Sequence, residues 1–153
     1  LMGRVYMSTL ECPFRTADSI IEEISKQTKI IVVDMHAEIT SEKVAMGWYL
    51  DGKVSAVIGT HTHVPTADGR ILPQGTAYIT DIGMTGPLDS IIGIKKEIIL
   101  KKYLTQMPIR FEVARDDLVF AGALVEIDEK TGKAKSIRRI AKPFEGRVEE
   151  SRE

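Results

Sequence analysis

The stretch that decides the fold is IIVVDMHAEITSEKVAMGWYLDGKVSAVIGTHTH, residues 30–63. It begins with an apolar run rich in β-branched residues, continues with apolar residues at helical spacing, and ends in a second short apolar run. We predict strands over residues 30–33 and 54–58, with a helix over residues 41–50 between them. This order forms a βαβ unit, whose strands run parallel with their carboxyl ends side by side.

Two details of this unit follow from its composition. The run at residues 30–33 has no polar alternation, which is typical of a strand covered on both faces. The helix is expected to start at a cap on Thr40 or Ser41 and to place Val44, Ala45 and Trp48 in the core.

The segments on either side complete the predicted fold. A strand is expected over residues 1–7, and a helix is expected to follow a cap at Thr16. Downstream we predict a strand at residues 76–80 that runs into a glycine-bearing loop, a helix at residues 94–104, and three alternating runs that form an antiparallel meander, at residues 109–114, 118–128 and 134–140. The polar tail at residues 144–153 is expected to fray.

The fold class is therefore α/β, with a parallel βαβ core and an antiparallel carboxyl-terminal meander. We find no repeat or break in composition, so we expect one domain over residues 1–153. The first residue, Leu1, is not an initiator methionine, and the residues after it have the composition of a strand interior. We therefore expect an amino-terminally truncated fragment.

Composition limits the partners. The 21 basic and 22 acidic residues give a formal net charge of −1, which provides no extended surface for nucleic acid or for a membrane. The single cysteine, Cys12, cannot form an internal disulfide, and no long apolar span occurs. These features favour a cytoplasmic location, with any nucleotide bound at a local site.

The histidines are the candidate functional residues. The chain has only three: His61 and His63, separated by one threonine after a predicted strand, and His36 after the neighbouring strand. Side chains two residues apart in extended backbone project from the same face, and ligand sites in open α/β sheets gather at the carboxyl ends of strands. We therefore predict that these three imidazoles form a metal site. The simpler alternative is three hydrogen-bonded loop histidines, because H-x-H alone is a weak motif.

The neighbouring residues leave the metal open. Three imidazoles suit zinc with an open coordination position. However, Asp34 and Glu38 flank His36, and carboxylates beside imidazoles either orient the ligands or favour manganese or iron.

Three motifs carry a resemblance to a known family: DMHAEITSEK at residues 34–43, GTHTHV at 59–64 and GTAYITDIGMTGP at 75–87. Together they resemble the carboxyl-terminal part of the YmdB-like branch of calcineurin-like metallophosphoesterases, over nearly the whole chain. The resemblance implies an α/β/β/α sandwich with two divalent or trivalent metal ions, iron or manganese ahead of zinc. It also implies that His36 and His61 bind one ion and that His63 binds the other.

The resemblance further implies a phosphodiesterase that acts on small cyclic nucleotides, including 2′,3′-cyclic nucleotides, by in-line attack of a metal-activated hydroxide. The family's early motifs are an aspartate in G-D-x-x-G, a G-E-N segment and a G-N-H with the catalytic histidine. Residues 1–15 contain none of them. The resemblance therefore implies that part of the site, including its catalytic residue, lies outside this chain, and no substrate-binding residue is assigned.

Other hypotheses remain open at this point. The chain is either half of an enzyme for a small nucleotide phosphodiester, with possible homo-oligomer formation, or a non-catalytic regulatory or oligomerising module of the same fold. A third hypothesis is a mononuclear zinc hydrolase that uses only these three histidines. The segment at residues 81–87 either lines a substrate pocket or forms an ordinary turn.

Overall fold

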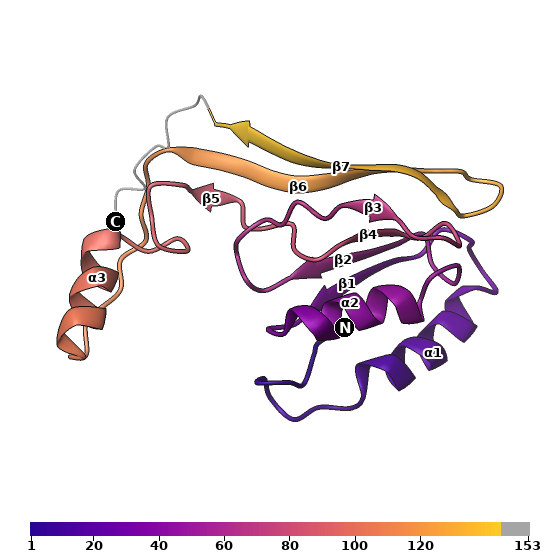
Figure 1. Cartoon of the computed structure of the whole chain (residues 1–153), viewed down its shortest axis with the longest axis horizontal. Coiled ribbons are helices and arrows are strands. Elements are labelled where there is room, and N and C mark those ends of the chain that lie inside the picture. Colours follow the sequence, from indigo (N-terminus) through magenta and orange to yellow (C-terminus); the bar gives the residue numbers. More distant parts are fainter. Residues whose placement is uncertain (145–153) are drawn as a thin grey trace. The chain divides into compact units, whose positions relative to one another are not determined.

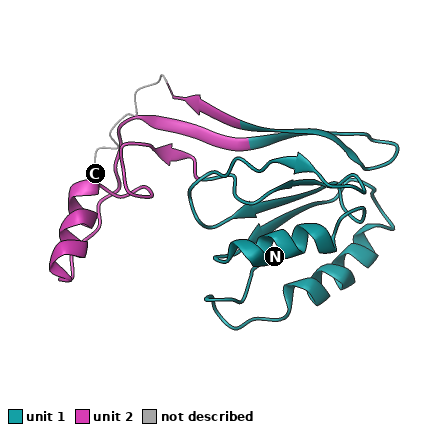
Figure 2. Ribbon diagram, in the orientation of Figure 1, with its two compact units in different colours: residues 1–83, 123–139 teal, residues 84–122, 140–153 magenta. Residues whose placement is uncertain are grey.

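A computed structural model describes residues 1–144 of the chain. It divides into two compact units (Figure 2): unit 1 is Leu1–Gly83 with Ala123–Arg139, and unit 2 is Met84–Gly122 with the described residues from Ile140 onward. The expectation of a single domain stays a prediction. Apart from Phe144, the tail that was expected to fray lies outside the described residues.

Ten helices and strands occur in the described part of the chain (Figure 1). In chain order they are α1 (Pro13–Ile24), β1 (Val32–His36), α2 (Thr40–Tyr49), β2 (Ala56–Thr60), β3 (Arg70–Ile71), β4 (Ala77–Ile79), β5 (Gly86–Pro87), α3 (Lys96–Thr105), β6 (Leu118–Ile127) and β7 (Ala134–Pro143). None of the helices formed by residues 1–144 has the length and apolar character needed to cross a bilayer.

The central sheet of unit 1 confirms the predicted βαβ unit. Its strand order is β1-β2-β4-β3, in which β1 and β4 run parallel to β2, and β3 runs antiparallel to β4. The register of β1 with β2 places His36 opposite Thr60. β1 ends three residues later than predicted, so that His36 is its last residue. β2 ends two residues later than predicted, at Thr60, and the histidine loop follows it directly.

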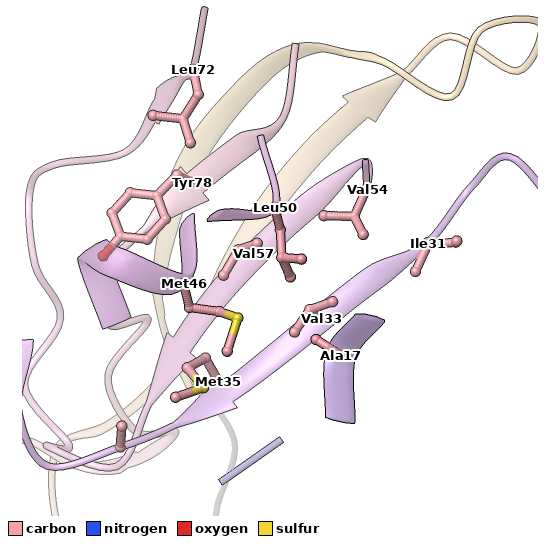
Figure 3. Packing of buried hydrophobic residues seen from close by; sticks show 11 residues of the cluster. Ala17, Ile31, Val33, Met35, Met46, Leu50, Val54, Val57, Leu72 and Tyr78 are labelled. Atoms are coloured by element: carbon pink, nitrogen blue, oxygen red, sulfur yellow. The ribbon is translucent and has the colours of Figure 1, made fainter. Parts of the chain in front are cut away.

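Helices α1 and α2 cover one face of this sheet, and Figure 3 shows the apolar core between them. Apolar side chains from β1, β2 and β4 meet those of the helices, and the fully buried members with the largest side chains are Met35, Met46, Leu50, Val57 and Tyr78. The burial of these apolar side chains is the main source of stability for this layer, because it removes their surface from water.

The opposite face of the sheet is covered within unit 1 by the parts of β6 and β7 that belong to it. Ala56 and Ala77 on the sheet pack with Ala134, and partly buried Val125 and Ile137 join them. Unit 1 therefore has an α/β/β layer order, and the predicted α/β class with a parallel core and an antiparallel sheet is confirmed.

Unit 2 contains β5, α3 and the adjoining parts of β6 and β7. Helix α3 buries Ile99 and ends at Thr105, and the capping residue Gln106 has a left-handed backbone. β5 pairs antiparallel with β6, and the Thr85 hydroxyl both donates to the Ala121 carbonyl and accepts from its N–H, at 3.1 Å each.

Two strand predictions were wrong. Residues 1–7 form no strand: only Met2 makes a β-bridge, to His36, and the chain then turns at Tyr6, whose φ is 58°. The run at residues 109–114 is also not a strand, because Val113 makes a single bridge to Ile94 while β5 occupies the place beside β6. The two-residue strand β5 is too short to give an alternating pattern in the sequence, and the hydroxyl of Thr85 holds it beside β6.

The predicted burial and caps also need correction. β1 is covered on one face only, since Val32 is 57% exposed while Val33 and Met35 are buried. Trp48 is 51% exposed, because α2 turns a different face to the sheet, with Glu42, Lys43, Met46 and Gly47 buried. Neither of the two amino-terminal helices has the predicted side-chain cap: α1 begins four residues earlier than expected with Pro13, whose fixed φ suits a first turn, and α2 follows Ile39.

Candidate metal-binding site

Two of the three predicted histidines meet at the carboxyl ends of β1 and β2. Nε2 of His36 lies 3.0 Å from Nδ1 of His61, and the two rings are nearly perpendicular, with centroids 4.7 Å apart. His36 is held by the parallel pairing of β1 with β2, whereas His61 is the first residue after β2 and has a φ of 103°. The strand ends and a left-handed turn together bring the rings into contact.

The outer nitrogen of each ring has its own hydrogen-bond partner. Nε2 of His61 lies 2.8 Å from Oε2 of Glu38. Nδ1 of His36 lies 3.0 Å from the Thr60 hydroxyl oxygen, and that hydroxyl donates to Asp34 at 2.7 Å. Glu38 therefore orients the ring of His61 directly, and Asp34 orients that of His36 through Thr60, which is one of the two roles that the sequence allows for these carboxylates.

These partners assign the tautomers of both rings. An ionised carboxylate only accepts hydrogen bonds, so His61 carries its proton on Nε2, facing Glu38. The Thr60 hydroxyl has one hydrogen, which goes to Asp34, so it accepts from Nδ1 of His36. In the neutral rings, the two nitrogens that face each other are therefore both lone-pair acceptors.

Two acceptors 3.0 Å apart repel each other unless a positive charge lies between them. A metal ion satisfies this arrangement: metal–nitrogen bonds of about 2.0–2.1 Å at a right angle separate the two nitrogens by roughly 3 Å. A single shared proton is the other cation that fits. The donor set of His36 and His61 thus fits a metal ion.

No hydrogen bond links the His63 ring to this pair among the residues that the structure describes. His63 is exposed, has a φ of 66°, and follows His61 by two residues in a bend that is not extended. Within residues 1–144, no group of three or more His, Cys, Asp or Glu side chains is placed to hold a metal ion. The metal-binding role of His63 stays a prediction.

Further residues of the site were not found from the sequence. Thr60 and Thr62 hold the histidine loop through their hydroxyls, and behind it lie Lys43 and Asp81, which form a buried ion pair. A lysine in an amphipathic helix looks solvated in a sequence, so no pattern indicated Lys43. The segment at residues 81–87, a possible pocket wall or an ordinary turn, begins with Asp81, whose carboxylate accepts hydrogen bonds from the N–H groups of Thr62 in the histidine loop and of Gly83.

Comparison with known proteins places these features in context. A sequence model described as YmdB-like protein matches residues 1–140. A 2′,3′-cyclic-nucleotide 2′-phosphodiesterase of Bacillus subtilis is 54% identical over 140 residues, which are 92% of this chain and 53% of that protein. A putative phosphatase/phosphodiesterase of Mycoplasma genitalium is 38% identical over 138 residues, covering 87% of this chain and 49% of that protein.

Solved structures agree with the fold. A hypothetical protein from Thermus thermophilus superposes with a TM-score of 0.86 at 43% identity, over 94% of this chain and 55% of that one. A novel phosphatase from Mycoplasma pneumoniae superposes with a TM-score of 0.83 at 36% identity, over 94% and 51% of the two chains. The chain therefore spans about half the length of the relatives it matches.

Proposed function

Because the chain belongs to the YmdB-like protein family, as its histidine motifs predicted, we propose that it supplies the histidine side of the metal centre of a phosphodiesterase. The proposed substrate is a small cyclic nucleotide of the 2′,3′ kind, since the Bacillus subtilis relative is described as a 2′,3′-cyclic-nucleotide 2′-phosphodiesterase. The proposed location is the cytoplasm, in keeping with a single cysteine. Assembly into a homo-oligomer is part of the same proposal.

One observation carries this proposal: Nε2 of His36 and Nδ1 of His61 face each other 3.0 Å apart while the outer nitrogen of each ring is hydrogen-bonded to another group, an arrangement that a bound metal ion would stabilise. Here Glu38 accepts a hydrogen bond from Nε2 of His61, and the Thr60 hydroxyl accepts one from Nδ1 of His36. A pair with a purely structural role would instead share one proton between the two inner nitrogens, and the metal content of the protein distinguishes these two cases.

Each residue has a defined part in the proposed site. Nε2 of His36 and Nδ1 of His61 would hold one ion, and His63 would hold the second. Glu38 keeps the proton of His61 on Nε2, and Thr60 with Asp34 keeps that of His36 on Nδ1. The bound metal would supply a Lewis acid for the phosphate oxygens and lower the pKa of an attacking water. The family resemblance favours iron or manganese over zinc for this centre.

Replacement of one ligand tests the proposal, in a protein in which this chain is joined to the other half of the proposed metal centre. His61→Ala should lower both the metal content and the hydrolysis of a 2′,3′-cyclic nucleotide by at least about 100-fold, because a converging donor is lost. Val64→Ala, an exposed side chain of the same loop without a ligating atom, is the matched control and should leave both unchanged.

The outcomes also separate the hypotheses. Full metal content without any hydrolysis of nucleotide diesters by the wild-type protein would favour a non-catalytic module. Unchanged hydrolysis in His61→Ala would refute the proposed metal site.

A further inference from the structure

Behind the histidine loop lies an ion pair that the proposed chemistry does not use. Nζ of Lys43, from α2, is 2.9 Å from Oδ2 of Asp81, which follows β4, and both side chains are completely buried. Buried ion pairs are weak contributors to stability, because the cost of removing two charges from water offsets their attraction. A role other than stability therefore has to be sought for this pair.

Both members of the pair contact the loop on either side of His61. The Lys43 ammonium group donates to the carbonyl of Thr60, the residue before His61, at 3.2 Å. Oδ2 of Asp81 accepts from the backbone N–H of Thr62, the residue after His61, at 3.0 Å and from its hydroxyl at 2.7 Å. One ion pair thus holds both peptide groups that border this histidine.

Two further features show that the loop is built around the pair. A Cβ atom on Gly59 would overlap the carbonyl oxygen of Thr80 and would lie 2.9 Å from Cδ of Lys43, so the glycine lets the Thr80 backbone approach and also leaves room for the lysine stem. The other oxygen of Asp81 accepts from the N–H of Gly83 at 2.8 Å, which anchors the carboxylate to the β4 side.

The backbone that the pair holds is one that needs support. His61 and His63 have φ values of 103° and 66°, which non-glycine residues rarely adopt. Such conformations persist where the surrounding structure fixes them, and they cluster at functional sites. Burial by itself would raise the pKa of Asp81, but hydrogen bonds from Lys43, Thr62 and Gly83 outweigh this and lower it, so the carboxylate stays ionised.

We infer that Lys43 and Asp81 are positioning residues that fix the strained backbone around His61 and thereby keep its Nδ1 beside Nε2 of His36. This inference rests on the proposed function for its consequence, which is metal affinity, but the ring placement itself is independent of that function.

The test compares two buried carboxylates in the intact protein. Asp81→Asn removes the charge that faces Lys43 and weakens the anchor at Thr62. Asp51→Asn is the matched control, because Asp51 is also buried and accepts from two backbone N–H groups, of Gln74 and Thr76, in a different turn of unit 1. Thr62→Val is a milder second variant, which removes only the hydroxyl hydrogen bond and is chosen to keep the fold.

We expect Asp81→Asn and Thr62→Val to weaken Mn²⁺ binding by about 10–100-fold and about 3–10-fold, the range typical of residues that orient ligands. In both variants kcat should fall while KM changes little, and Asp51→Asn should lower the melting temperature without either effect. Unchanged Mn²⁺ affinity and kcat in both Asp81→Asn and Thr62→Val would overturn the inference.

A second readout separates this inference from the proposed function. In the metal-free wild-type protein, NMR should show a nuclear Overhauser effect between the ring protons of His36 and His61, and this effect should be lost or weakened in Thr62→Val but kept in Asp51→Asn. If the wild-type protein bound no metal, the proposed function would fail, and this comparison would still decide the inference: a retained effect in Thr62→Val would reject it.

Discussion

Neutral imidazoles bind a metal only when their lone pairs are aimed at it, so the groups on the far side of each ring matter as much as the rings. For His61 that group is Glu38, whose carboxylate is half exposed and 2.8 Å from Nε2. For His36 it is the Thr60 hydroxyl, which is itself fixed by Asp34. Each ring is thus oriented by a separate partner.

Glu38 is expected to act on metal affinity through His61. Glu38→Ala should weaken Mn²⁺ binding by about 10–100-fold, because the ring loses the acceptor that fixes its tautomer and orientation. Glu38→Gln keeps an oxygen acceptor without the charge and should have a smaller effect. Isothermal titration with Mn²⁺ measures both, and a wild-type affinity in Glu38→Ala would show that the contact with His61 has no orienting role.

At the residue scale, the sequence predicted the histidines better than their surroundings. His36 and His61 follow from two apolar strands whose ends are forced together by parallel pairing. The ion pair of Lys43 and Asp81 could not be predicted in this way, because it depends on which face of α2 is turned towards the sheet. Of the predicted apolar stripe, only Val44 packs against the core, whereas Ala45 and Trp48 are exposed, because the face that α2 turns inward buries two charged residues that have partners.

At the scale of elements, helix α2 approaches the sheet closely because it carries a glycine. A Cβ on Gly47 would overlap the ring of Tyr78 in β4 and lie 2.7 Å from its Cε2. Tyr78 cannot move aside easily, because it is buried and its hydroxyl is 2.9 Å from that of Thr80.

Gly47→Ala should therefore lower the free energy of unfolding by about 1–3 kcal/mol, the usual range for overpacking. This is opposite in sign to the gain of up to about 1 kcal/mol that alanine brings to a helix interior. Urea denaturation followed by circular dichroism measures the change. Gly69→Ala is the control, because its added Cβ would have no neighbour closer than 3.8 Å, and its stability should stay near that of the wild type. Equal stability of the two variants would contradict the close approach of α2.

The turn between β6 and β7 is held by one carboxylate. A hydrogen bond from Lys135 at 3.0 Å is the main cause that lowers the pKa of Asp128 to about 2, and the N–H of Thr131 adds to it. Because this pKa is lower in the folded than in the unfolded chain, the carboxylate stabilises the turn above about pH 4. That contribution is lost as the pH falls towards 2.

NMR titration of the Asp128 carboxyl carbon should give a midpoint of about 2, and amide exchange at Thr131 should accelerate over the same range after correction for its intrinsic pH dependence. Asp128→Asn keeps an oxygen acceptor for the turn but cannot ionise, so this pH dependence should disappear. A midpoint near the ordinary value of about 4 would mean that Lys135 does not act on the carboxylate in solution.

Regular elements with strong periodicity were predictable, and those set by single contacts were not. The alternating runs that became β6 and β7 and the βαβ unit follow from their apolar pattern. β5 has only two residues, and its place beside β6 depends on the Thr85 hydroxyl. Residues 1–7 have a strand composition but leave β1 after one bridge, where the Glu42 carboxylate binds the N–H of Arg4 at 3.1 Å.

At the scale of the whole molecule, the number of ligands limits what this chain can bind. Each of two metal ions needs at least about four ligands, and even three imidazoles fill fewer than half of those positions. Within residues 1–144 no cluster of three ligating side chains occurs. The relatives it matches are about twice as long, which leaves room in such proteins for the remaining ligands.

The chain of residues 1–153 by itself should therefore retain fewer than two equivalents of manganese or iron after dialysis, and it should not hydrolyse a 2′,3′-cyclic nucleotide. The same chain joined to the amino-terminal half of the Bacillus subtilis relative, with which it shares 54% identity, should retain two equivalents and regain hydrolysis, because the family resemblance implies that the missing carboxylate and amide ligands lie in that half. Elemental analysis and a phosphodiester assay on both proteins measure this. One tightly held zinc ion together with hydrolysis by residues 1–153 alone would contradict the two-metal proposal, since three histidines would then be a sufficient site.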